Sequence, residues 1–331
     1  MINFDKELDI IYTVDDGFLP LVSTSLASII ENNRDKNINV FVATDKDETT
    51  ENFSKLVNHH SCNGVQISYI DAKKYDSVFK EKNMNKWGSN SYYTYWRLVV
   101  PKLINVDYAV FVDADVLCLK TIESIDLSGK ACGCVIDSVH SYYNKLMKTD
   151  KNFCFFNSGI IFFDIKKWKS EHLTEKCIDY IKNVKSDFFM ADQDLLSLAL
   201  RDEIKVISPK YNWFAGYDYY GIYESILLYS LNKKRFYKES DLESASKDIV
   251  FYHCLDGVFK RPWSIDNNHP AKEKYDYYKK KSAWPNYEKK EELPVVMKAE
   301  KILERVLPFK LYYKIHNFSI ILMIRIKTLH L

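Results

Sequence analysis

The chain has 331 residues, of which 47% are hydrophobic, so it has enough apolar material for a large core and is not a disordered protein. Lysine and arginine number 47 against 45 aspartates and glutamates, a balance that gives no electrostatic case for nucleic acid as a partner. The seven cysteines are scattered without a C-x-x-C pair, which disfavours a zinc ribbon and fits reduced thiols in a cytosol. The charged opening, MINFDKELDI, is not typical of a signal peptide.

The first part of the chain alternates between strand and helix patterns. Apolar β-branched runs and helical spacings predict strands at 8–14, 38–44 and 65–70, and helices at 18–32 and 49–60. This alternation indicates βαβ units and a mainly parallel sheet, in which ligands bind beyond the carboxyl ends of the strands. Asp15 and Asp16 follow the first strand and are expected to lie at that edge.

A second acidic pair follows the apolar run 108–112, as Asp113-Ala114-Asp115. On an extended chain the two carboxylates would point the same way and Ala114 the opposite way. Paired carboxylates repel each other unless a cation lies between them, and a hard ion such as Mg²⁺ or Mn²⁺ prefers oxygen ligands. This pair is therefore a candidate metal site.

The middle of the chain adds polar residues within apolar surroundings. A helix is predicted at 91–103 with Arg97 among aromatic residues, followed by a strand at 132–137 that ends in Asp137. Asn157-Ser158-Gly159 interrupts the most hydrophobic run, 153–168, which is costly unless these residues line a cavity or form a bulge. This placement favours a binding role for the three residues.

The next elements bring further candidates. Residues 166–184 have a helical pattern, and Asp192-Gln193-Asp194 opens a short helix. A last strand at 248–253 ends in His253, a reasonable third ligand for a cation held by two aspartates. Neither G-x-G-x-x-G after the first strand nor a P-loop motif occurs, so a dinucleotide enzyme or P-loop NTPase is disfavoured.

Taken in order, these motifs resemble glycosyltransferase family 8, the retaining enzymes with the GT-A fold that include bacterial lipooligosaccharide galactosyltransferases. The resemblance covers about residues 8 to 265. It rests on YTVDDGF, YTYWRL, FVDADVL, FNSGIIFFDIKKW, DQDLL and the cluster from His253 to Trp263. It implies an α/β GT-A domain with a mixed, mainly parallel sheet over 1–265. Beyond this domain, the shift in composition predicts a connecting segment, 266–294, and a basic helical tail, 295–331.

The resemblance also implies the residues of a donor site for a UDP-sugar. Mn²⁺ or Mg²⁺ would be held by Asp113, Asp115 and His253, and Asp192 or Gln193 would act in catalysis. The nucleotide-sugar would contact Thr13, Asp15, Asp16, Arg97, Asp113, Ala114, Asp115, Asp137, Asn157, Ser158, Gly257 and Lys260. Two positions depart from the family pattern: Gly17 replaces a common asparagine, and the histidine motif carries an extra residue and an inserted Arg261. Either Lys260 or Arg261 would meet the phosphate.

The resemblance implies transfer of a hexose, galactose ahead of glucose, to a glycan of a bacterial surface polysaccharide, lipooligosaccharide or glycoprotein. Retention needs either a covalent intermediate or same-face attack, and same-face transfer is favoured because Gln193 is a poor nucleophile. The alternatives are a sugar-phosphate nucleotidyltransferase and an inactive nucleotide-sugar-binding subunit.

The tail carries seven basic residues against Glu300 and Glu304, interleaved with apolar ones. Its longest charge-free run, 315–324, is too short to span a membrane. A helix lying on an anionic membrane surface is favoured, with the enzyme on the cytoplasmic face. The alternative is a helix packed on the domain or in a dimer contact.

Overall fold

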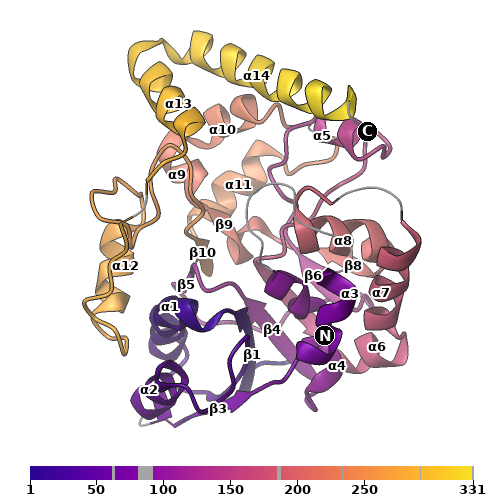
Figure 1. Ribbon diagram of the computed structural model, residues 1–331, viewed down its shortest axis with the longest axis vertical. Coiled ribbons are helices and arrows are strands. Elements are labelled where there is room, and N and C mark those ends of the chain that lie inside the picture. The colour runs from indigo at the N-terminus through magenta and orange to yellow at the C-terminus, as the bar shows by residue number, and fades with distance from the viewer. Residues whose placement is uncertain (62–63, 81–91, 185–187, 233, 291, 330–331) are drawn as a thin grey trace.

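The computed structural model describes residues 1–331 except 62–63, 81–91, 185–187, 233, 291 and 330–331, with the side chains of 327–329 also undescribed. Its centre is a seven-stranded sheet in the order β3-β2-β1-β4-β7-β6-β8 (Figure 1). The strands are β1 (Glu7–Val14), β2 (Asn37–Thr44), β3 (Val65–Tyr69), β4 (Tyr108–Val112), β6 (Cys132–Cys134), β7 (Ile160–Asp164) and β8 (Ile204–Val206). Only β7 runs against its neighbours, so the expected mixed, mainly parallel sheet is present.

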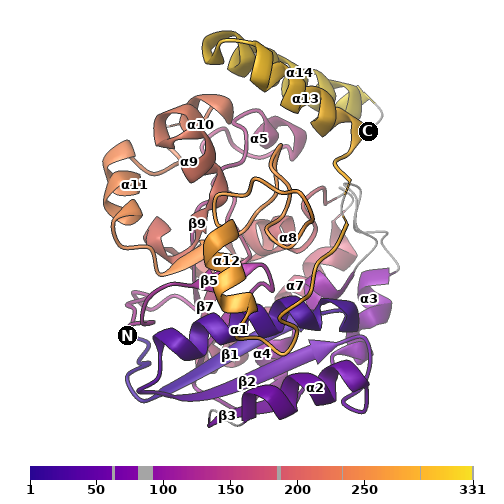
Figure 2. The same ribbon diagram turned by 90° about the vertical axis from the view of Figure 1, so that its left-hand side faces the viewer.

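Helices cover the sheet on both sides (Figures 1 and 2). The N-terminal half contributes α1 (Leu19–Asn32), α2 (Glu51–His60), α3 (Asp76–Lys80), α4 (Val100–Leu103), α5 (Tyr143–Leu146) and α6 (Ile165–Ser170). The rest are α7 (Leu173–Asn183), α8 (Ala191–Leu200), α9 (Ala215–Tyr220), α10 (Ile222–Leu228), α11 (Glu239–Ser246), α12 (Lys272–Lys279), α13 (Val295–Val306) and α14 (Phe309–Leu329).

The two central strands, β1 and β4, place the first candidate residues at one height. Both strands are almost wholly buried, as their continuous apolar runs require in a sheet covered on both faces. They pair in parallel, with Ile10 opposite Val110 and Ile11 opposite Phe111. The same offset sets Thr13 level with Asp113, so the two acidic turns open at the same edge of the sheet.

A second, three-stranded sheet in the order β5-β10-β9 stands beside that edge. It consists of β5 (Val116–Cys118), β9 (Trp213–Phe214) and β10 (Phe251–His253). Strand β10 runs antiparallel to β5 and pairs His253 with Val116, one residue beyond Asp115. This pairing joins two parts of the chain that lie far apart in sequence.

Three predicted elements differ from the observed ones. The predicted helix 91–103 is a 3₁₀ segment, Tyr92–Leu98, followed by α4, while residue 91 lies outside the described residues. Pro101 explains the break, because it lacks the N–H that a continuous helix would need there. The predicted helix 166–184 is divided between α6 and α7 at His172, whose φ of 52° is left-handed. The predicted strand 132–137 pairs regularly only over β6, with an isolated bridge at Ile136.

The tail forms two helices at the end of the molecule opposite β3 and α2 (Figure 1). Helix α14 packs on α5 and α10, and α13 packs on α14. The segment before the tail contains α12, which packs on α1 (Figure 2). Among the described residues, neither tail helix nor any other combines the length and apolarity needed to cross a membrane.

Candidate functional site

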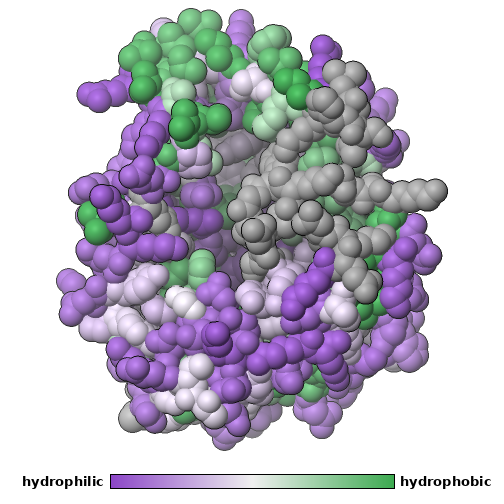
Figure 3. All heavy atoms as spheres, in the orientation of Figure 1, coloured by the Kyte–Doolittle hydropathy of each residue, from purple (hydrophilic) through white to green (hydrophobic). Residues whose placement is uncertain are grey.

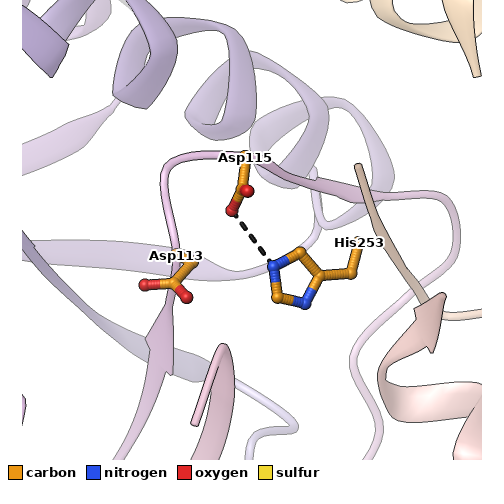
Figure 4. Close-up of side chains that lie close together, drawn as sticks. All are labelled: Asp113, Asp115 and His253. Carbon is orange, nitrogen blue, oxygen red and sulfur yellow. Dashed lines mark ion pairs between the residues drawn. The ribbon is translucent and has the colours of Figure 1, made fainter. Parts of the chain in front are cut away.

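The expected cluster of Asp113, Asp115 and His253 is present between the two sheets (Figure 4). One ligand atom from each residue lies within 4.8 Å of the others. His253 Nε2 is 3.2 Å from Asp115 Oδ1, and the imidazole is almost wholly buried. The three residues come from the end of β4, the start of β5 and the end of β10.

The two carboxylates converge by a different route from the one the sequence predicted. The chain does not stay extended: it turns at Ala114 and Asp115, and the Val116 N–H donates to the Asp113 carbonyl at 3.1 Å. The turn is needed because β4 and β5 belong to different sheets. The expectation from strand alternation was therefore wrong locally, although both carboxylates do face one site.

Arg97 lies behind the cluster and is buried. Its guanidinium forms ion pairs with Asp113 (Nη2 to Oδ1, 3.0 Å) and Asp192 (Nε to Oδ2, 3.1 Å). Nη1 also donates to the Ser158 carbonyl at 2.8 Å and hydroxyl at 3.1 Å. A planar guanidinium suits such a multiple contact. Arg97 thus balances two buried carboxylates and fixes the loop after Asn157.

The two aspartates of the cluster differ in their electrostatics. Burial raises the pKa of Asp113 to about 6, although Arg97 opposes the shift. Burial also disfavours the charged form of Asp115, but His253 and Arg261 outweigh it and hold its pKa below the usual range. A cation that bound here would therefore meet at least one firmly ionised carboxylate.

One wall of the site is made of amide side chains. Asn157 Nδ2 donates to Gln193 Oε1 at 3.3 Å, and Gln193 Nε2 donates to the Asp137 carboxylate. On the other side, Asn212 Nδ2 donates to Asn157 Oδ1 at 2.7 Å. Burial raises the pKa of Asp137 even with the hydrogen bond from Gln193.

Asp192 and Gln193 belong to the first turn of α8, as the sequence predicted. Their neighbour Asp194 has a structural role, because it accepts the backbone N–H groups of Phe189 and Met190 at 2.8 Å each. Asp192 is thus directed at Arg97, and Gln193 is directed at Asp137.

The expected nucleotide residues after β1 lie in two different environments. Thr13 Oγ1 is buried and, among the described residues, has no hydrogen-bond partner. Asp15 is half-buried, and burial together with Asp45 raises its pKa. Asp16 is tied to the start of α2, accepting from Thr50 Oγ1 at 2.8 Å and Asn52 Nδ2 at 2.6 Å. Of the three, Thr13 is buried, Asp15 is half-buried and Asp16 is held by contacts with α2.

The segment after β10 separates the two candidate phosphate residues. Arg261 forms an ion pair with Asp115, and its Nη1 donates to the Cys254 carbonyl at 2.8 Å. Lys260 instead reaches the Ile265 carbonyl at 3.4 Å. Gly257 is half-buried, and a Cβ there would lie 3.1 Å from the Phe259 ring. The structure brings Arg261 to the cluster and leaves Lys260 outside it.

The site includes one residue that the sequence did not indicate, Asn212. It precedes β9 and is fully buried, with its Oδ1 2.9 Å from His253 Nδ1. A polar residue between aromatic ones, in Tyr211-Asn212-Trp213, is the same kind of signal as Asn157 in its apolar run.

The donor set fits a hard divalent ion. Two carboxylates and an imidazole are its ordinary protein ligands, and fewer than four of them leave positions for ligand oxygens. The observation that supports this fit is the short approach of His253 Nε2 to Asp115 Oδ1 at 3.2 Å in a buried setting.

Comparison with known proteins agrees with this geometry. The sequence pattern described as glycosyl transferase family 8 matches residues 9–265, which is most of the chain. The chain belongs to glycosyl transferase family 8. It is therefore a transferase by family, with the cluster described above inside the matched region.

Relatives within the family are distant. The chain is 22% identical to general stress protein A of Bacillus subtilis, over 85% of this chain and 96% of that protein. It is 24% identical to lipopolysaccharide 1,3-galactosyltransferase of Salmonella typhimurium, over 84% of this chain and 79% of that protein. It is 27% identical to lipopolysaccharide 1,2-glucosyltransferase of Escherichia coli K12, over 64% and 63%.

Solved structures of two glycosyltransferases show the same fold. The galactosyltransferase LgtC, in complex with donor and acceptor sugar analogues, matches with a TM-score of 0.63 at 16% identity, covering 88% of this chain and 99% of that one. The bifunctional glycosyltransferase WbbM matches with a TM-score of 0.67 at 19% identity, over 85% of this chain and 51% of that one. The expected α/β GT-A fold is thereby confirmed.

Proposed function

We propose that this family 8 enzyme moves a hexose from a UDP-sugar to a glycan acceptor of a bacterial surface polysaccharide, lipooligosaccharide or glycoprotein, with retention at the anomeric carbon. The observation that carries the proposal is the Asp113–Asp115–His253 cluster, which adjoins both a buried amide wall and Arg261. Galactose stands ahead of glucose, because relatives of both kinds match and the family resemblance favours galactose. One hydroxyl separates the two sugars.

Asp113, Asp115 and His253 are the residues that would hold Mn²⁺ or Mg²⁺. When bound, such an ion stabilises the negative charge of a departing diphosphate. Arg261 would add a second positive group beside it, because its guanidinium already lies against Asp115. Thr13 and Asp15 would lie nearest the nucleoside, because they follow β1 at the edge of the sheet where the cluster lies.

The sugar would lie against Asp137, Asn157, Asp192 and Gln193. Asp192 Oδ2 lies 3.1 Å from Arg97 Nε, but among the described residues this oxygen accepts no hydrogen bond. Gln193 is an amide, which is a weak nucleophile. The amide at position 193 supports same-face transfer, in which the leaving phosphate takes the proton of the acceptor hydroxyl, over a covalent intermediate on that residue.

The tail is proposed to hold the enzyme against the cytoplasmic face of a membrane. Its polar side chains turn inward: Tyr312 donates to Glu300 at 3.1 Å, and Asn317 donates to the Leu227 carbonyl at 3.1 Å. Tyr312 and Ile324 are buried, but many other large apolar side chains of the tail turn outward, as the upper part of Figure 3 shows. The exposed set is Val295, Val296, Ile302, Val306, Leu311, Ile315, Phe318, Leu322 and Ile326.

Exposed basic residues accompany this apolar face. Lys298, Arg305, Lys310, Lys314 and Arg325 are all exposed on the same two helices. Apolar side chains with a basic border are the composition that binds anionic lipid surfaces. A dimer contact would need the apolar face without requiring these charges.

The experiment that tests the function is a hydrolysis and transfer screen over UDP-sugars, with and without Mn²⁺. The expected result is metal-dependent release of UDP from UDP-galactose, with UDP-glucose next. Formation of pyrophosphate from a nucleoside triphosphate and a sugar phosphate would point instead to a nucleotidyltransferase. Mn²⁺-dependent binding of UDP without turnover of any donor would indicate an inactive binding subunit.

A further inference from the structure

We propose that Asn212 is a positioning residue that fixes the protonated nitrogen of His253 as Nδ1 and so aims the free Nε2 at the metal position. The inference rests on the metal site proposed above. It concerns the hydrogen-bond chain from the backbone of Gly159, through Asn157 and Asn212, to the imidazole.

The series of hydrogen bonds starts from a group that can act only as a donor. The backbone N–H of Gly159 can only donate, and it lies 2.9 Å from a terminal atom of the Asn157 amide. That atom must therefore be the oxygen, Oδ1. A side chain at position 159 is not possible here, because a Cβ would lie 2.2 Å from His253 Cε1 and 2.8 Å from Nδ1.

Asn212 links Asn157 to His253 and fixes the direction of the hydrogen bond to the histidine. The Asn212 amide approaches Asn157 Oδ1 at 2.7 Å, so it must present its NH₂ group there. Its own oxygen then faces His253 Nδ1 at 2.9 Å and can only accept. Nδ1 therefore carries the proton, and Nε2 keeps a lone pair unless it is protonated as well.

The consequence appears on the opposite side of the ring. Nε2 faces Asp115 Oδ1 at 3.2 Å, so in the neutral histidine two acceptors confront each other. Such a contact is favourable only with a positive charge there, supplied either by a second proton on the ring or by a bound cation. By holding one proton on Nδ1, Asn212 leaves Nε2 and Asp115 as the two groups that share this positive charge.

The same anchor orients the other wall of the site. With Oδ1 of Asn157 committed to Gly159 and Asn212, its NH₂ group donates to Gln193 Oε1 at 3.3 Å. Gln193 must then turn its own NH₂ group toward the Asp137 carboxylate. The backbone N–H of Gly159 therefore fixes the hydrogen-bond directions at both His253, the proposed metal ligand, and Gln193, the expected sugar contact.

The position of Asn212 makes the arrangement rigid. Asn212 is fully buried, and it directly precedes β9, which pairs in parallel with β10. The register sets Phe214 opposite His253. A buried amide needs its hydrogen bonds, since leaving them unmade is costly, so both of its contacts are expected to persist.

The first test uses the intact wild-type protein, with histidine labelled by ¹⁵N and the His253 signals assigned by their absence in His253→Asn. NMR should show a hydrogen-bonded Nδ1–H on His253 both without metal and with Mg²⁺ and UDP. On adding Mg²⁺ and UDP, the Nε2 resonance should shift. A wild-type ring that carries its proton on Nε2 alone would overturn the proposal.

The second test compares two substitutions at position 212. Asn212→Leu removes the acceptor, so the Nδ1–H signal should disappear, and Mn²⁺ affinity in the presence of UDP should fall by about 10- to 100-fold, as loss of a partner of a metal ligand does. Asn212→Asp keeps an acceptor for Nδ1 and should keep the Nδ1–H signal. Mn²⁺ affinity is read by electron paramagnetic resonance of free Mn²⁺.

Asn144→Leu is the matched control, because Asn144 is an equally buried asparagine whose partners are Asp150, Phe153 and Arg235. It should leave the His253 signals and Mn²⁺ affinity unchanged. Asn212→Leu that retains both the Nδ1–H signal and wild-type affinity would refute the role of Asn212. The proposed function fails separately: a wild-type protein with the Nδ1–H signal but no Mn²⁺ binding supports the amide chain and overturns the metal site.

Discussion

The site around Asp113, Asp115 and His253 and the tail are opposites in how they distribute polar and apolar groups. In the site, ionisable side chains are buried: Arg97 is 4% exposed and His253 is 3% exposed. In the tail, apolar side chains are exposed: Phe318 is 67% exposed and Ile302 is 62% exposed. Each arrangement is costly alone, because buried ionisable groups need partners and large apolar patches need cover. Under the proposals above, each region meets something outside the chain, an ionic ligand in one and an apolar surface in the other.

The largest effect on transfer should come from substitutions at Asp113 and Asp115. Asp115→Asn and Asp113→Asn should each lower transfer by about 10²- to 10³-fold, because charge at the reacting diphosphate loses its counterpart. Turnover is measured on the donor found in the screen, and thermal melting shows whether the fold is kept. Asp107→Asn, at an exposed aspartate paired with Lys166, is the control. Wild-type turnover by either cluster variant would remove the metal role.

The tail should show the next largest effect. Phe318→Ser combined with Leu322→Ser should weaken binding to anionic vesicles by about two orders of magnitude, since each buried apolar side chain contributes roughly 1.5–3 kcal/mol. Donor hydrolysis in solution should not change. Val206→Ser, at an exposed valine outside the tail, is the control.

Sedimentation in free solution separates the two uses of the tail. If the double variant converts a dimer to a monomer and leaves vesicle binding intact, the face is a contact between copies of the chain. The proposed contact between the tail and a membrane would then be wrong.

A smaller effect distinguishes the two basic residues after β10. Arg261→Gln should weaken UDP binding by about 10- to 100-fold, the worth of one charged hydrogen bond, while Lys260→Gln should change it little. Calorimetry with UDP and Mn²⁺ measures both. A larger loss for Lys260→Gln would mean that the segment rearranges when the nucleotide binds.

The smallest effect concerns the pH dependence of stability that His60, a buried histidine, contributes. His60 Nε2 lies 2.8 Å from Ser23 Oγ, and the same oxygen accepts the Ala283 N–H at 2.9 Å. Burial, followed by His59, lowers the pKa of His60 to about 3 from a usual value of 6.5. Between these values the unfolded chain binds a proton that the folded chain does not.

The stabilising contribution of His60 is therefore complete above about pH 6.5 and is lost as the pH falls. Its share of the slope is up to about 1.4 kcal/mol per pH unit. Urea unfolding of His60→Gln at several pH values should show a flatter dependence than the wild type. His172→Asn, at an exposed histidine elsewhere in the chain, should keep the wild-type slope.

Much of the large sheet could be predicted from the sequence, because its first strands are long apolar runs separated by helices of regular spacing. The cluster could be located for a related reason: polar residues such as Asp113 and Asn157 interrupt runs that would otherwise be entirely buried. The second sheet could not be predicted as a sheet. A strand ending in His253 was expected, but β5 and β9 have three and two residues, too few to show a period. The sheet forms only because β5, β9 and β10 meet in space.

The finer features of the site depend on that meeting. The turn at Ala114 follows from the change of sheet, and Asn212 acquires its role only when β9 pairs with β10. Whether Lys260 or Arg261 faces the cluster depends on how the segment after His253 curls, which no local pattern specifies. The left-handed residue His172 is likewise set by packing, since nothing in the repeat of apolar residues marks it.

The pairing of β10 with β5 also bears on the order in which the molecule can assemble. Every strand of the large sheet has been synthesised once residue 206 is added, whereas His253 is added later. Contacts between residues far apart in sequence are slow to form. The nascent chain can therefore begin to form its large sheet before the Asp113–Asp115–His253 cluster is complete. A newly made molecule should thus gain its catalytic activity only late in folding.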